Sequence, residues 1–185
     1  MNCANVAIAA ILLLGSITSP EAAATKRRIP GCEKEFCDLA GVIMTRTLNT
    51  PRTPYEKVGG LYYLGRCIDK IRLKQAGLLR PDFFELMGKG FDARIMGYLE
   101  LDYGQFTEFV LIGATDEQCW DYCAQHGRKL NDLTTLIWND FSSKRGWKDS
   151  ASELLVKFKA ESGLAARDDL QTLFEFWEVD EGRKP

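Results

Sequence analysis

The chain has 185 residues, of which 45% are hydrophobic and 11% are aromatic. That is enough apolar material for one ordinary folded domain, and it argues against intrinsic disorder. The formal net charge is −2, and basic residues alternate with acidic ones along the chain. This excludes a broad electrostatic attraction to phosphate backbones, so we expect no nucleic-acid binding.

The N-terminal segment differs from the rest of the chain. Residues 6–17 form an apolar run and three alanines follow at 22–24, which together resemble a secretory signal peptide with its cleavage site. The run is too short for a transmembrane span, which needs about 20 apolar residues. Basic residues follow the run instead of preceding it, against the usual charge rule. A mis-called start, with translation beginning at Met44, explains the segment equally well.

We therefore divide the chain into an N-terminal extension, residues 1–43, and a single helical domain, residues 44–185. Removal of a signal peptide would leave five cysteines and a start at Met44 would leave three, and neither odd count indicates a disulfide framework. Reduced thiols favour a cytoplasmic protein. Export is the alternative if the apolar segment is a genuine signal peptide, and Cys32 and Cys37 could then pair.

The second half of the domain carries clear helix signals. Thr115 and Gln118 fit a capping box, which predicts a helix over 116–126. The pairs Ser150 with Glu153 and Asp168 with Gln171 predict two more helix starts by the same device. Between these segments, residues at helical spacing predict a further helix before Gly146, namely Leu133, Leu136, Ile137, Asp140 and Phe141.

The first half of the domain follows the same rules. A stripe at three- and four-residue steps predicts a helix that ends at Gly77, and it comprises Leu61, Leu64, Ile68 and Ile71. Pro81 opens a short helix, and Asp92 and Asp102 are expected to cap two others. No segment alternates with period two, so no sheet is expected. The sequence predicts an all-α, compact multi-helix bundle of about seven or eight short helices.

Several motifs resemble a known family. They include PRTPYEKVGGL at 51–61, GRCIDKIRL at 65–73 and KRGW at 144–147, and the similarity extends to the C-terminus. The chain resembles an uncharacterised bacterial family, the domain of unknown function fifty sixty-nine. This resemblance implies no catalytic residue, because no activity is established for the family. It implies a start near Met44 and hence the cytoplasm, because similar proteins begin close to the first motif.

Cys119, Cys123 and His126 share one face of the predicted helix over 116–126 and could in principle ligate zinc. A closed site needs a fourth ligand, and no CxxC pair or second histidine is present to supply it. Buried cysteines behave as small hydrophobes, so core packing is the favoured interpretation. We expect no metal site and no cofactor.

Charged residues form three candidate ligand-binding groups. Arg66, Asp69, Lys70 and Arg72 follow one predicted helix, where Asp69 could pair with Arg66 or Arg72 and leave surplus positive charge for an anion. The alternative is a solvated helix face with ion pairs worth about 0.3–0.5 kcal/mol each.

The second group lies at a glycine turn that opens a helix, where backbone N–H groups bind anions. It consists of Lys89, Asp92 and Arg94, and the alternative is a plain Asp92 N-cap. The third includes Lys144 and Arg145 beside Gly146, where the alternative is ordinary capping and packing.

These groups favour a binding or interaction module that recognises an anionic small molecule or an acidic protein partner through Arg66, Lys70 and Lys89. On this hypothesis, replacing Arg66 or Lys70 by alanine leaves folding nearly intact. One rival is an enzyme with Asp69 or Asp92 as acid or base in a polar interhelical cleft. Another is a purely structural or oligomerising helical protein. No transmembrane span is expected, and the sequence does not predict the oligomeric state.

Overall fold

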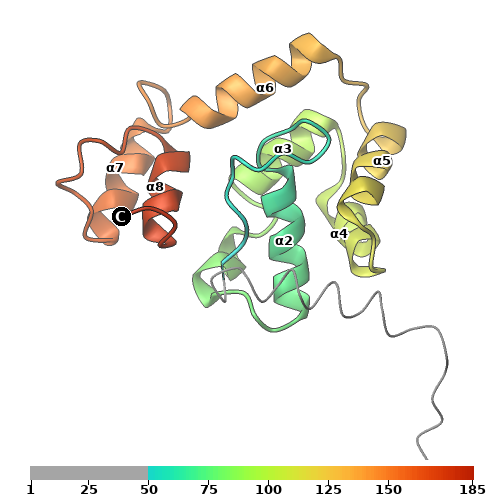
Figure 1. Ribbon diagram of the computed structural model, residues 1–185, viewed down its shortest axis with the longest axis horizontal. Coiled ribbons are helices and arrows are strands. Elements are labelled where there is room, and N and C mark those ends of the chain that lie inside the picture. Colours follow the sequence, from blue (N-terminus) through green and yellow to red (C-terminus); the bar gives the residue numbers. More distant parts are fainter. Residues whose placement is uncertain (1–49) are drawn as a thin grey trace, which may run out of the picture.

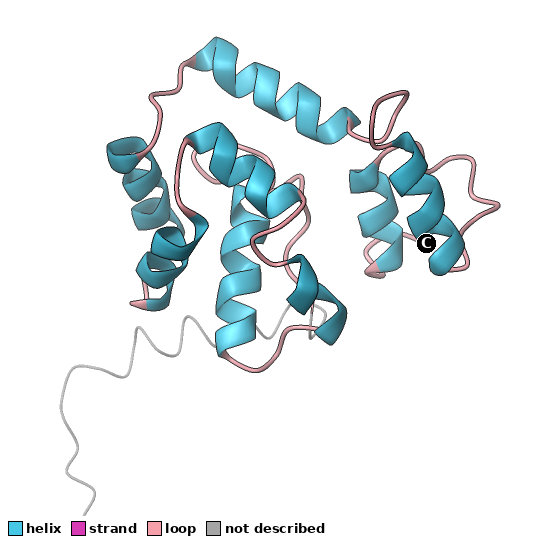
Figure 2. Cartoon of the chain, turned by 180° about the vertical axis from the view of Figure 1, so that it is seen from behind, coloured by secondary structure: helices cyan, strands magenta, loops and turns pink. Residues whose placement is uncertain are grey.

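A computed structural model describes residues 50–185 of the chain. Within that range it contains seven α-helices and one short 3₁₀-helix, and no strand (Figure 2). An isolated β-bridge joins Val58 and Leu61. The expected all-α class is thus confirmed for the part of the chain that is described. The elements are α2 (Leu64–Gln75), η1 (Pro81–Leu86), α3 (Phe91–Leu99), α4 (Tyr103–Leu111), α5 (Asp116–His126), α6 (Asp132–Lys144), α7 (Ser152–Glu161) and α8 (Leu173–Asp180).

The helices form two groups joined by α6. Helices α2 to α5 lie together, α7 and α8 lie side by side, and α6 spans from one group to the other (Figure 1). Helix α2 packs mainly on α4, whereas α8 packs on α6 and α7. One cluster of buried side chains runs through both groups, including Ile68 of α2, Phe106 of α4 and Phe174 of α8.

Helix α2 carries the apolar stripe that the sequence predicts. Leu64, Ile68 and Ile71 are all buried. The helix begins three residues later than the stripe, because Tyr63 takes a left-handed conformation with φ of 72° and breaks the helical path. Its end at Gly77, with φ of 67°, is as expected.

Of the five expected caps, two are confirmed and three are wrong, those at Asp92, Ser150 and Asp168. The Thr115–Gln118 capping box is present at α5, and Asp102 accepts a hydrogen bond from the Gln105 backbone at α4. Helix α7 has no side-chain cap and begins at Ser152, since Asp149 rather than Ser150 accepts from the Ala151 backbone. The capping box of α8 is formed by Thr172 and Glu175, four residues after the expected pair.

Helix α6 lies where the sequence predicts a helix, but most of its apolar stripe is exposed. Leu133, Leu136 and Ile137 are 63%, 57% and 53% exposed, and the opposite face, with Trp138 and Asn139, is buried. The physical reason lies in the turn at residues 60–62. The Asn139 side chain accepts from the Tyr62 backbone at 2.8 Å and donates to the Gly60 carbonyl at 2.9 Å. Trp138 donates to the Tyr62 carbonyl at 3.0 Å, so this face of α6 supplies side-chain partners to backbone groups of the partly buried turn.

The expectations for the N-terminal extension, including the pairing of Cys32 with Cys37, fall outside the described residues. Among residues 50–185, no helix combines the length and the apolar character that crossing a bilayer requires.

Candidate ligand-binding site

A half-open pocket of about 260 Å³ lies where α2, η1, α3, α7 and α8 meet. Most of its wall is apolar, and much of that wall is aromatic, comprising Tyr63, Phe83, Phe91, Phe158 and Trp177. Five cationic side chains also line it, and among residues 50–185 no carboxylate does. They are Arg66, Lys70, Lys89, Arg94 and Arg145. All five are candidates from the sequence, so the fold gathers residues from three separate sequence groups.

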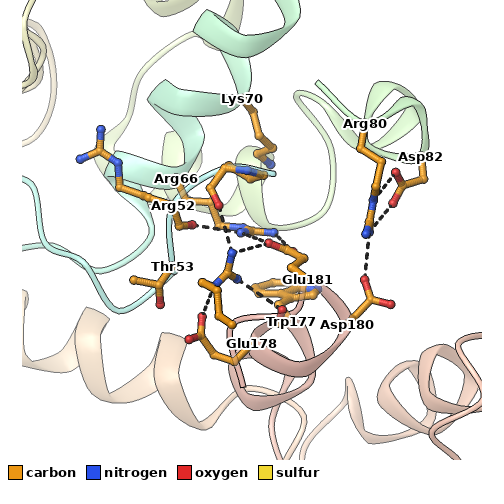
Figure 3. Close-up of polar contacts among 12 residues, drawn as sticks. Arg52, Thr53, Arg66, Lys70, Arg80, Asp82, Trp177, Glu178, Asp180 and Glu181 are labelled. Atoms are coloured by element: carbon orange, nitrogen blue, oxygen red, sulfur yellow. Dashed lines mark hydrogen bonds and ion pairs between the residues drawn. The ribbon is translucent and has the colours of Figure 1, made fainter. Parts of the chain in front are cut away.

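Arg66 projects from α2 and is only 2% exposed. Its guanidinium forms a two-pronged ion pair with Glu181 and donates to the Arg52 carbonyl at 3.1 Å (Figure 3). The guanidinium carbon lies 5.2 Å from the centroid of the Trp177 ring. Burial alone would lower the pKa of Arg66, but the Glu181 carboxylate outweighs it and raises the pKa above its usual value.

One donor of Arg66 remains without a partner. Its Nε is buried and has no hydrogen bond to any of the described residues. An unpaired buried donor costs about 1–3 kcal/mol, and this atom is sealed from solvent behind the rest of the Arg66 side chain.

Lys70 is also buried, and it is held by a carboxylate behind the pocket wall. Its Nζ forms an ion pair with Asp92 and donates to the Tyr63 hydroxyl at 3.0 Å. The Tyr63 hydroxyl donates to Asp92 at 3.0 Å, and the Gly88 backbone donates to the other Asp92 oxygen at 3.2 Å. Burial raises the pKa of Tyr63 well above its usual value, with the Asp92 charge adding to the effect.

This arrangement corrects two expectations. Asp92 is fully buried and does not cap α3, whose N-cap Gly90 has no side-chain cap. Arg66 and Lys70 are not part of a solvated helix face, because each forms a buried ion pair. A single α2 face therefore points its charges into the interior, where both partners come from distant segments.

Lys89 and Arg94 differ from the other cations of the pocket. Both are exposed at the start of α3, and neither forms an ion pair with any residue in the described range. The Arg94 guanidinium lies 5.7 Å from the centroid of Phe141, and that of Arg145 lies 5.6 Å from the same ring. Arg145 is itself paired with Asp149 at 2.8 Å.

Three other candidates lie away from the pocket. Asp69 accepts two bonds from the Arg52 side chain, at 2.9 and 2.7 Å, so the expected pairing with Arg66 or Arg72 is wrong. Arg72 pairs instead with Asp116 at 2.7 Å. Lys144 forms an exposed pair with its own helix neighbour.

Sequence patterns do not single out Arg52, the centre of this network. It also donates to Asp116, at 2.7 Å, and so links the segment before α2 to α5. Burial opposes the charge of Arg52, but its hydrogen bond to Asp69 and the Asp69 charge raise the pKa of Arg52 above the usual value. The sequence signal that could have identified Arg52 is its position between Pro51 and Pro54, in the motif that carries the family resemblance.

Cys119 and Cys123 are buried, and burial raises the pKa of each thiol, to about 11 and about 12 respectively. Thiols so protonated are poor nucleophiles and poor metal ligands. His126 stacks on Tyr122, with ring centroids 4.4 Å apart. Within residues 50–185, no three His, Cys, Asp or Glu side chains are grouped so as to hold a metal ion.

The geometry can be set beside known proteins. A family model described as a domain of unknown function, DUF5069, matches residues 48–183. The chain belongs to this family. No curated protein matches the chain. The matched range contains every residue that lines the pocket, and the family description names no ligand or reaction.

Proposed function

We propose that this DUF5069 protein binds a small organic anion whose apolar, ring-containing part fills the pocket between α2, α3 and α8. The observation that carries the proposal is the composition of the pocket wall, which combines aromatic side chains with five cations and, in the described part of the chain, no carboxylate. Ligand sites are typically concave and mostly apolar, with a few polar groups that orient the ligand. An anion is favoured because the lining supplies only positive charge.

The rival hypothesis of a carboxylate acid or base is less well supported. Asp92 is fully buried behind Lys70 and Tyr63, and both side chains bind it. Asp69 is held by Arg52 and does not line the pocket. Neither carboxylate can reach a ligand in the pocket, as general acid–base catalysis requires.

Isothermal titration calorimetry with a matched pair of compounds tests the proposal on the full chain. We use 2-naphthoate and its neutral amide, 2-naphthamide, which share the ring and differ in charge. The naphthoate is expected to bind more tightly by about tenfold or more, since an added charge contact in a partly solvated site contributes a few kcal/mol at most. Equal affinities for the two compounds, or no binding of the naphthoate, would contradict the proposal.

Two variants locate the anion. Lys89→Gln and Arg94→Gln are each expected to weaken naphthoate binding by about tenfold, near 1.4 kcal/mol, while the affinity for naphthamide stays unchanged. Lys129→Gln is the matched control, because Lys129 is an exposed lysine outside the pocket lining. An equal loss in the control variant would mean that general surface charge, rather than the pocket, attracts the anion.

A further inference from the structure

The charge balance around the pocket narrows the class of ligand. Three of the five lining cations have carboxylate partners: Glu181 for Arg66, Asp92 for Lys70 and Asp149 for Arg145. The other two, Lys89 and Arg94, have no such partner among the described residues. Two positive charges are therefore left uncompensated at one pocket mouth, and this inference rests on the function proposed above.

Both uncompensated charges lie at the first turn of α3, which has nine residues. Lys89 directly precedes the N-cap Gly90, and Arg94 lies one turn into the helix. Helical side chains lean toward the N-terminus, which brings Arg94 back over that turn. Two dispersed carboxylates on a ligand would fit this arrangement less well than one doubly charged group.

Backbone groups at the same place add to the charge. The N–H groups of Gly90 and Phe91 have no hydrogen-bond partner in the part of the chain described, as is usual for a first helical turn. A β-carbon placed on Gly90 would meet nothing within 4 Å, so there is open space above this turn. The partial positive charge of a helix N-terminus favours an anion there.

The aromatic part of the wall is a second and independent observation. The Arg66 guanidinium carbon lies 5.5 and 5.2 Å from the ring centroids of Phe83 and Trp177, so Arg66 itself packs against both rings. Phe91 and Phe158 also line the pocket. Aromatic faces of this kind suit a planar ring.

We propose that the ligand is a small aromatic phosphomonoester, with its phosphate at the start of α3 between Lys89 and Arg94 and its ring against the part of the wall that includes Phe91, Phe158 and Trp177. A phosphomonoester carries a charge of about −1.5 to −2 at neutral pH and three strong acceptor oxygens, which matches two cations and two backbone donors. The volume of about 260 Å³ equals roughly nine water molecules at about 30 Å³ each. That is room for one small ring system and its phosphate.

Calorimetric titration with two phosphates tests the double charge. The probes are 2-naphthyl phosphate, a dianion, and methyl 2-naphthyl phosphate, a diester with a single charge. The monoester is expected to bind about tenfold more tightly than the diester. Lys89→Gln and Arg94→Gln are each expected to reduce this ratio to about threefold or less, as loss of one charge contact of about 0.7–1.4 kcal/mol implies, whereas Lys129→Gln leaves it unchanged.

The outcomes separate this inference from the proposed function. Equal binding of the two phosphates, with 2-naphthoate still bound, would overturn the phosphomonoester and leave an anion-binding pocket. The phosphomonoester site would also be overturned if Lys89→Gln and Arg94→Gln both kept the tenfold preference for the monoester over the diester, because the phosphate would then not lie at the start of α3. Failure of 2-naphthoate and of both phosphates to bind would overturn the inference and the proposed function together.

Discussion

The ion pair between Lys70 and Asp92 is expected to be a major determinant of stability. Their side chains are 4% and 0% exposed. In Lys70→Met, the Asp92 carboxylate stays buried without its cationic partner, although the Tyr63 hydroxyl and the Gly88 backbone still donate to it. Removal of one partner from a buried pair costs about 3–5 kcal/mol, a large part of a total stability of roughly 5–15 kcal/mol.

Urea denaturation followed by far-ultraviolet circular dichroism measures this loss as a lower transition midpoint. Lys144→Met is the matched control, since Lys144 pairs with Asp140 at 61% and 59% exposure and should lose at most about 0.5 kcal/mol. The double variant Lys70→Met/Asp92→Asn should lose less than the sum of the two single variants, because no unpaired charge remains. A loss below about 1 kcal/mol in Lys70→Met would refute the burial argument and restore the expectation of a solvated helix face.

Three further predictions concern other parts of the fold. Burial alone would raise the pKa of Asp116, but two arginines lower that pKa in the folded protein. The ionised Asp116 therefore stabilises the fold above its unfolded pKa near 3.8, and this stabilisation is lost as the pH falls through the lower pKa of the folded state. Asp116→Asn should flatten the acid limb of a curve of stability against pH. In Gly59→Ala, the new β-carbon would lie 2.0 Å from the Trp120 indole at a φ of +58°, so a loss above about 2 kcal/mol is expected in urea titrations. Asn139→Ala leaves two turn backbone groups without side-chain partners and should cost about 1–3 kcal/mol by the same measurement.

Local signals in the sequence predict local structure well. The Thr115–Gln118 box, the Asp102 cap and the apolar stripe of α2 each depend on residues within about one or two turns of helix. The all-helical class follows from such signals.

Long-range partners could not be read from spacing. Arg66 lies 115 positions from Glu181, and nothing near α2 in the sequence indicates that its charges point inward. The exposure of the apolar stripe of α6 also depends on a long-range contact, because the Asn139 side chain is hydrogen-bonded to a turn 79 positions away. Five of the nine candidate residues line one pocket, but which of these cations have a carboxylate partner could be read only from the fold.

A crystal structure of the full chain with 2-naphthoate tests the central claim most directly. We expect the naphthalene ring to lie against Trp177. The carboxylate is expected at the start of α3, within hydrogen-bonding distance of the Gly90 or Phe91 backbone and close to Lys89. A carboxylate bound at any other surface, or an empty pocket under conditions that saturate binding in solution, would contradict it.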